Sequence, residues 1–311
     1  MINLIKNELM KLFSRKLTKI LLVILCIFAI GGSIATNSYK AQTEDWRIVA
    51  QKTIEVNENR IELMNLSPQL KADAENKVAI SKYRLENNLP APKETVTSAM
   101  LNISGLVEMV IIMVLLSAAE IVSREYSDGT MKLLLIRPHS RLKILISKYL
   151  TIIIFGIIAL LLTIITSGIT NMFIYGFGNI SSVDLFINQS GEIVQLSTLT
   201  QMLKMYGFSI FPILSYATIA FAISTIIKNS ALAVGISLVT MILGNSMIEA
   251  TSKIAWLKYL PFANSDMSLY IYHLQPRPEM SIFFSIGILL IYIVSFLYIS
   301  LFVFNKRDVS I

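Results

Sequence analysis

The stretch SREYSDGTMKLLLIRPHSRLKILISK, residues 123–148, is a polar and basic insert between two long apolar runs. Asp128-Gly129 predicts the end of the helix that arrives from the first run, because Asp-Gly favours turns and glycine tolerates positive φ. A short segment over 130–137 then stops at Pro138, since the residue before a proline is pushed away from helical angles, and Ser140 can cap the next helix. The predicted order is helix, turn, short helix, turn, helix.

The short segment of this insert combines an apolar patch with a charged rim. The patch consists of Met131, Leu133, Leu134, Leu135 and Ile136, and the rim of Glu125, Asp128, Lys132, Arg137, Arg141 and Lys143. In water, such a pattern is typical of an interaction surface. The alternative is that residues 133–136 lie at the lipid interface or pack beneath their own bundle.

The composition indicates an integral membrane protein. Hydrophobic residues make up 54% of the chain and charged residues 15%, which is too apolar for a soluble domain of 311 residues. The formal net charge of +7 fits basic loops that face anionic lipid, so we expect membrane lipid and no nucleic acid as a partner. A single cysteine, Cys26, excludes a disulfide framework and a cysteine metal cluster.

We predict an all-α, polytopic membrane protein. Its six apolar runs are long enough to cross a bilayer as helices. These spans are 20–36, 101–122, 148–174, 205–227, 231–249 and 282–304. Before them, residues 1–19 form a basic amphipathic helix that is expected to lie on the inner membrane surface. A cleaved signal peptide is the alternative interpretation of the first run.

The long polar segment 37–100 is predicted to be a helical hairpin outside the membrane. Apolar and small residues recur at helical spacing in both of its halves, and Ser67-Pro68 is typical of the start of a second helix. We interpret the hairpin as a cap over the bundle; contact with a substrate or a partner is the alternative. The other connecting segments are 123–147, 175–204, 228–230, 250–281 and the tail 305–311.

The charge distribution predicts the orientation of the spans. An even number of spans places both termini on one side, and the segments on that side carry a large excess of Lys and Arg, whereas the opposite segments are balanced. The positive-inside rule then places the termini and the insert 123–147 in the cytoplasm, and the hairpin outside. We expect a multi-pass protein of a bacterial plasma membrane.

No constellation of residues predicts an enzyme. The chain has no Gly-x-x-x-x-Gly-Lys-Ser/Thr loop for ATP phosphates, and no activated nucleophile with a neighbouring base. His139 and His273 fall on opposite sides of the membrane in the predicted topology, which excludes a shared metal site. We therefore expect no catalytic residue, no metal ligand and no cofactor bound by this chain.

Two residues inside the spans are candidates for a transport pathway. A carboxylate within a span is costly to insert, so Glu108 either faces a polar pathway or forms a hydrogen bond across the bundle. Pro212 is expected to kink or interrupt the fourth span. Glu120 and Arg124 stand four residues apart, acid first, which predicts an ion pair near the inner surface.

The insert and its surroundings resemble the permease subunit of type 2 ATP-binding cassette (ABC) transporters. The resemblance rests on Glu125, Gly129-Thr130, Lys132, Leu133-Leu134, Pro138 and Ser140-Arg141, with the basic amphipathic start, the six spans, the turn at Lys228 and the segment 256–262. It implies two permeases, identical or related, above a dimer of cytoplasmic ATPase subunits that hold ATP and Mg. The implied ATPase-coupling residues are Glu125, Asp128, Gly129, Thr130, Lys132, Leu133, Leu134, Arg137, Pro138 and Arg141.

The resulting expectation is the permease subunit of an ATP-driven exporter. Analogy with the resembled family favours an antimicrobial peptide or a lipid-like molecule as the substrate, although the large segment 37–100 departs from the plainest members and leaves the substrate open. Two other classes remain. An ion-coupled secondary transporter would use a polar site such as that of Glu108, and a non-transporting sensor or assembly protein would act through the hairpin.

Overall fold

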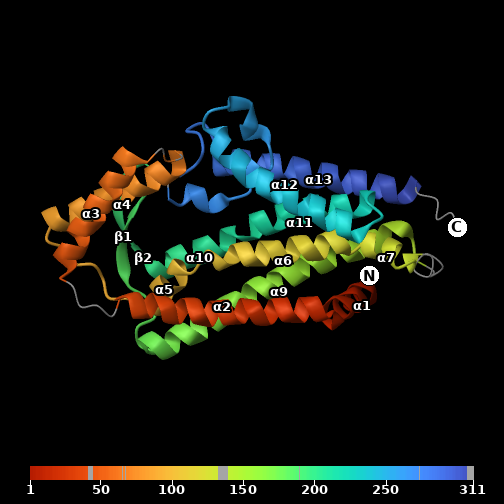
Figure 1. Ribbon diagram of the computed structural model, residues 1–311, viewed down its shortest axis with the longest axis horizontal. Helices are drawn as coiled ribbons and strands as arrows, with labels where there is room; N and C mark the ends of the chain where they lie inside the picture. The colour runs from red at the N-terminus through yellow and green to blue at the C-terminus, as the bar shows by residue number, and fades with distance from the viewer. Residues whose placement is uncertain are drawn as a thin grey trace.

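The computed structural model describes residues 1–40, 45–64, 66, 68–131, 139–188, 190–272 and 274–306. The chain is an elongated bundle of helices with a small sheet at one end (Figure 1). Its helices are α1 (Ile2–Ser14), α2 (Lys16–Lys40), α3 (Trp46–Leu63), α4 (Pro68–Glu86), α5 (Val96–Asn102), α6 (Leu106–Glu120), α7 (Ser123–Ser127), α9 (Arg141–Tyr175), α10 (Thr198–Phe208), α11 (Ile210–Ile226), α12 (Ser230–Thr251) and α13 (Ile282–Lys306). The strands are β1 (Val183–Ile187) and β2 (Ile193–Ser197), and the 3₁₀ helices are η1 (Ala255–Tyr259), η2 (Phe262–Asn264) and η3 (Met267–Tyr270).

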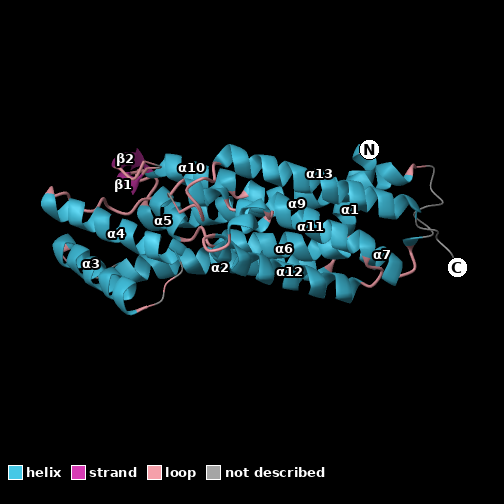
Figure 2. Cartoon of the chain, turned by 90° about the horizontal axis from the view of Figure 1, so that it is seen from above, coloured by secondary structure: helices cyan, strands magenta, loops and turns pink. Residues whose placement is uncertain are grey.

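The prediction of a polytopic helical membrane protein is confirmed. Six helical segments in the described ranges are long and apolar enough to cross a membrane: Lys16–Asn37, Leu106–Ser127, Arg141–Tyr175, Thr198–Ile226, Ser230–Ile248 and Ile282–Lys306. Their outward side chains are apolar and uncovered, as in Phe283 and Val294, which is the arrangement that a lipid environment stabilises. Figures 1 and 2 both place the start of α1, the end of α13 and α7 at one end of the bundle.

The centre of the bundle is α6, which packs against α2, α9, α11 and α12. Val110, Val114 and Ala118 recur on its inner faces and are fully buried. Gly156 of α9 allows a close approach there, because a Cβ atom at this position would lie 2.9 Å from Ile213 and 3.1 Å from Val114. Small and branched side chains thus allow α6, α9 and α11 to pack closely together.

Two of the spans are interrupted, where single helices over 101–122 and 205–227 were predicted. The second span is divided into α5, α6 and α7, and the break before α7 is held by Ser224 of α11, whose Oγ accepts hydrogen bonds from the backbone N–H groups of Val122 and Ser123. The fourth is divided into α10 and α11 at Ser209. The ring of Pro212 collides with the carbonyl four residues earlier, which explains a break at this place and confirms the predicted interruption.

The first and third spans begin earlier than predicted. Helix α1 ends at Ser14 and α2 starts at Lys16, so 16–19 belongs to the spanning helix rather than to the amphipathic one. Helix α9 starts at Arg141 rather than at 148. Ser140 caps it as predicted, because its side chain accepts a hydrogen bond from the backbone N–H of Lys143.

The segment 175–204 contains a β-hairpin, so the all-α prediction is wrong in this detail. Strands β1 and β2 pair antiparallel, with Val183 opposite Ser197 and Ile187 opposite Ile193. Burial alternates along β1, in which Leu185 and Ile187 are buried. Gly191, with φ of +81°, supplies the turn.

Helices α3 and α4 pack on each other at the end of the bundle opposite α7 (Figure 2), in the segment for which a helical hairpin was predicted. Ala50 and Asn57 of α3, and Ala74 and Ser81 of α4, are buried on the faces that were predicted from their spacing. Pro68 begins α4, as expected for a proline at the first helical position. The segment 250–281 contains three short 3₁₀ helices, and η1 ends directly before Leu260-Pro261.

Candidate functional site

A buried lysine occupies the end of the bundle where the insert begins. Lys148 of α9 is only 1% exposed, and its Nζ lies 2.7 Å from Oε2 of Glu8 on α1 and 3.1 Å from Oε1 of Glu125 on α7. Lys11 of α1 contacts the same two acids, at 3.3 and 3.0 Å. These four residues, Glu8, Lys11, Glu125 and Lys148, are called the ionic cluster below. It joins three helices that are distant in the sequence.

The ionic cluster contains two acids and two bases, so no charge in it is left without an opposite charge. Balance of this kind is needed, because an unpaired charge in a buried position is very costly. Around Lys11, burial opposes the charged form, but the carboxylates of Glu8 and Glu125 outweigh that effect and raise the pKa of Lys11. The cluster therefore holds α1 against α7 and α9 in one arrangement.

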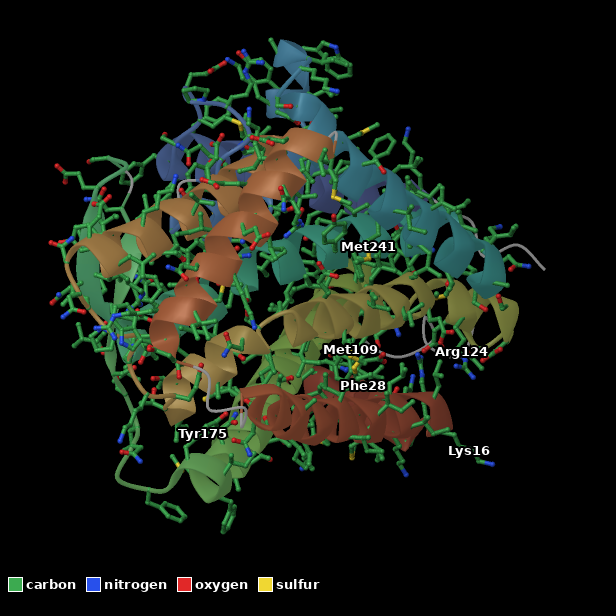
Figure 3. All side chains as sticks on the ribbon, turned by 60° about the vertical axis from the view of Figure 1, so that its left-hand side comes forward. Lys16, Phe28, Met109, Arg124, Tyr175 and Met241 are labelled. Atoms are coloured by element: carbon green, nitrogen blue, oxygen red, sulfur yellow. The ribbon has the colours of Figure 1, made fainter. Side chains whose placement is uncertain are left out.

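A second group of charges extends the ionic cluster towards the surface. Glu120 accepts hydrogen bonds from Arg15 and from Arg124, both at 3.2 Å, and Arg124 also reaches Asp128 at 3.4 Å. The predicted Glu120–Arg124 ion pair is thus confirmed, with Arg15 as an additional partner. In Figure 3, Lys16 and Arg124 lie at this end of the bundle, whereas Tyr175 lies at the other.

The turn that starts the insert is attached directly to the ionic cluster. Gly129 has φ of +70°, as predicted from the Asp-Gly pair, and, apart from its chain neighbours, no atom of the described residues lies within 4 Å of where its Cβ would be. Thr130 Oγ1 donates to Glu125 Oε2 at 2.6 Å. The glycine thus provides the left-handed backbone and the threonine connects that backbone to Glu125.

Neighbouring contacts connect the insert to the remaining helices. Ser127 Oγ donates to the carbonyl of Lys228 and accepts from the N–H of Ser230, both at 3.0 Å, so α7 is joined to the turn between α11 and α12. Arg141 donates to the carbonyl of Asn305 at 2.9 Å, which joins the start of α9 to the end of α13. The predicted coupling residues Lys132, Leu133, Leu134, Arg137 and Pro138 lie outside the described residues.

The sequence predicted a role for Glu125, Asp128, Gly129, Thr130 and Arg141. It did not identify Glu8, Lys11 and Lys148, which form the ionic cluster with Glu125. A signal existed for Lys148, because a lysine followed by a long apolar run either marks the membrane edge or needs an acid. The identity of that acid could not be read from the sequence, since Glu8 lies 140 positions earlier.

The two predicted pathway residues meet in one cavity nearer the other end of the bundle. Glu108 of α6 and Pro212 of α11 both line a space of about 330 Å³. The other lining residues are Ser104, Gly105, Val107, Ile111, Met205, Ser209, Tyr216, Met241, Ile248, Ser265, Asp266 and Ser268. Figure 3 shows Met241 on α12, which forms one wall.

The cavity contains two carboxylates. Asp266 caps η3 by accepting hydrogen bonds from the N–H and the hydroxyl of Ser268, at 2.9 and 2.5 Å. For Glu108, no hydrogen-bond or ion-pair partner lies among the residues that the structure describes. The hydrogen bond across the bundle, which was the alternative for Glu108, is thus not found in the described part; a role of Glu108 in a pathway stays a prediction.

Comparison with known proteins gives a family without an assigned activity. Residues 73–310 match the family model described as "Protein of unknown function (DUF2705)". The chain is 31% identical over the full length of both chains to the uncharacterized protein YhcI of Bacillus subtilis (strain 168). It is also 28% identical to the uncharacterized membrane protein YdbK of the same strain, over 62% of this chain and 75% of YdbK.

These matches correct one expectation from the sequence. The chain was expected to be a member of the type 2 ABC permease family, but the family model that covers most of its length is that of DUF2705, and the two relatives are described only as uncharacterized. The motif around Glu125 and Gly129-Thr130 is short, and short motifs recur between families more readily than whole chains do.

Proposed function

Because the chain belongs to the DUF2705 family, whose description states no activity, we propose its function from its own residues: it is the membrane-spanning subunit of an exporter that a separate cytoplasmic ATPase drives. The transported molecule is a peptide or a lipid-like compound. Two such subunits, identical or related, form the pathway in a bacterial plasma membrane, and a dimer of ATPase subunits binds the ATP and Mg. The insert 123–147 is the part that the ATPase contacts.

The single observation that carries this proposal is the ionic cluster. A segment that served only as a connection between two spans would not need to be attached to a buried lysine that pairs with two acids. Here the start of the insert is attached through Glu125 to α1 and α9, and through Ser127 to the turn between α11 and α12. A force that the ATPase applies to the insert is therefore transmitted to most of the bundle as a movement of connected helices.

The orientation follows from charge. The end of the bundle that carries the ionic cluster also carries the start of α1 and the end of α13 in Figures 1 and 2, and its segments hold the excess of Lys and Arg. With the positive-inside rule, this end faces the cytoplasm, where an ATPase is present, and α1 lies on the inner surface of the membrane. The hairpin of α3 and α4 is then outside the cell.

Co-purification of the full-length protein tests the proposal. After gentle detergent extraction, we expect a stoichiometric ATPase to remain bound, and Leu133→Asp with Leu134→Asp to release it, because two acids remove the apolar anchor of the interface. The matched control is Leu63→Asp with Met64→Asp, which changes two exposed apolar residues at the opposite end of the bundle. An ATPase that stays bound to the Leu133/Leu134 variant contradicts docking there.

A cation-coupled transporter is a second candidate, favoured by the cavity of Glu108. A carboxylate in a cavity between broken helices is the kind of site that binds a coupling cation. Reconstituted into liposomes without an ATPase, a protein of this second class shows cation-dependent flux that Glu108→Gln abolishes. A protein of the first class shows no flux until the ATPase and ATP are supplied.

A further inference from the structure

A second cavity lies beside the β-hairpin, apart from the cavity of Glu108. It has a volume of about 260 Å³ and is enclosed by β1 and β2, α10, the end of η3 and the first residue of α13. Its walls are largely apolar, and polar groups are contributed by Asn188, Gln201 and Lys204. The apolar lining consists of Ile187, Leu196, Phe208, Tyr270, Ile271 and Ile282.

Gln201 in this cavity has a buried amide oxygen for which the described part of the chain offers no hydrogen-bond donor. It is 2% exposed, and its Oε1 finds no donor among the residues that the structure describes. A buried polar oxygen without a partner is destabilising, so such groups normally have an occupant nearby that supplies the missing hydrogen bond. The amide therefore indicates that a ligand with a hydroxyl or an N–H group completes this site.

Lys204 supplies a positive charge at the same cavity. It follows Gln201 by one helical turn, so both side chains lie on one side of α10. It is exposed, and it has no carboxylate partner in the described part of the chain. The cavity thus offers one cation, one unfilled acceptor and an apolar wall, which together suit an anionic headgroup with a hydroxyl and an attached hydrocarbon chain.

The position of the cavity along α10 matches the level of lipid headgroups. The candidate span Thr198–Ile226 has 29 residues, whereas about 20 cross the hydrocarbon core. Counted from Ile226, the core ends near Gly207, and Lys204 lies about 5 Å beyond it at 1.5 Å per residue. Ile282, the first residue of the span formed by α13, lies at the same cavity. A phosphate at this level reaches Lys204 while its chain stays in the membrane.

We propose that this cavity binds the headgroup of an anionic membrane lipid whose polar part carries a free hydroxyl, as in a phosphatidylglycerol. The phosphate pairs with Lys204, the hydroxyl donates to Oε1 of Gln201, and the first part of the acyl chain lies along Phe208 and Ile282. The bound lipid then connects the β-hairpin to α10 and α13. This inference does not depend on the proposed exporter function, because it concerns a different cavity and requires no partner protein.

The proposal is tested by native mass spectrometry of lipid binding to the purified full-length protein in detergent. The probe is dioleoyl-phosphatidylglycerol, and the neutral comparison is dioleoyl-phosphatidylcholine. We expect the phosphatidylglycerol adduct to be retained preferentially, and Lys204→Met to weaken it about tenfold, the effect of about 1.4 kcal/mol. The matched control is Lys253→Met, an exposed lysine outside the cavity. Gln201→Met, which keeps the volume, is expected to weaken binding several-fold.

Several results would overturn the proposal. If Lys204→Met binds phosphatidylglycerol as tightly as Lys253→Met does, the ion pair with the phosphate is excluded. If phosphatidylcholine is retained as well as phosphatidylglycerol, recognition of the anion is excluded. Because Lys204 is exposed, its variant is expected to fold, so a folding defect in Gln201→Met leaves the lysine test decisive. Soluble glycerol 1-phosphate distinguishes a membrane lipid from a free phosphate compound as the ligand. Weak competition at millimolar concentration supports a lipid, whereas binding tighter than that of phosphatidylglycerol overturns the proposal.

Discussion

The ion pairs at the two ends of the bundle differ in how far their side chains are buried. At the end of the ionic cluster, Lys148 is 1% exposed and its acids 8% and 13%. At the other end, the pair Lys82–Glu58 between α4 and α3 leaves its side chains 52% and 45% exposed, although its 2.8 Å separation is as short. Exposed pairs contribute about 0–1 kcal/mol, whereas removing one partner of a buried pair costs about 3–5 kcal/mol. The first end is therefore fixed by its buried pairs, whereas the contact of α3 with α4 is held mainly by side-chain packing.

The connection of the hairpin to the bundle supports this difference. Arg84 of α4 pairs with Asp184 of β1, and Asn76 of α4 donates to the carbonyl of Tyr272 at 3.2 Å. These are few polar contacts for two long helices, and the hairpin sits at the end of the molecule in Figures 1 and 2. We expect hydrogen exchange to be faster in α3 and α4 than in α6.

The largest effect is expected from Lys148→Met. The variant leaves Glu8 and Glu125 with only Lys11 to neutralise them in a buried position, so the free energy of unfolding should fall by about 3–5 kcal/mol. Thermal unfolding in detergent measures the loss. Lys143→Met is the matched control, since Lys143 is an exposed lysine on the same helix. Equal stability of the two variants would show that the cluster is not essential for this end.

A smaller effect is expected from Gly129→Val. A branched side chain at φ of +70° costs about 1–2 kcal/mol, and the open space around the position means that this cost comes from the backbone alone. We expect near-normal expression together with reduced ATP-driven transport. Gly129→Asn should recover transport, because asparagine tolerates the left-handed region. Full transport by the valine variant would contradict a requirement for this turn.

The smallest effect is expected from Lys82→Met at the other end. Its ion pair with Glu58 is exposed, so the free energy of unfolding should change by less than about 1 kcal/mol, and the change should decrease further in high salt. Unfolding curves at two ionic strengths measure it. A loss as large as that of Lys148→Met would remove the contrast between the two ends.

The sequence was sufficient where the deciding information is local. Apolar length identified the spans, the Asp-Gly pair predicted the positive φ of Gly129, and Ser140 and Pro68 marked helix starts. Each of these depends on a few neighbouring residues and on steric or capping rules that hold in any fold. For the same reason, the spacing of Glu120 and Arg124 predicted their ion pair correctly.

The sequence was insufficient where distant segments decide the structure. The break before α7 depends on a hydroxyl from α11, since Ser224 replaces the helical partners of Val122 and Ser123. The meeting of Glu108 with Asp266 in one cavity likewise requires the packing of α6 against the segment 250–281. The β-hairpin had a local signal in the alternation of 183–187, but its short strands lie in a polar stretch that reads as a loop.

The contact between Glu8 and Lys148 also has a consequence for synthesis of the chain. The ribosome releases Glu8 long before Lys148, which follows 140 residues later. Until the third hydrophobic helix has entered the bilayer, Glu8 has Lys11 of its own helix as a partner but not yet Lys148, so we expect the first helix to stay in the polar surface layer. The two ends of this ion pair thus set an order of assembly, in which α1 reaches its final place only after α9 has entered the membrane.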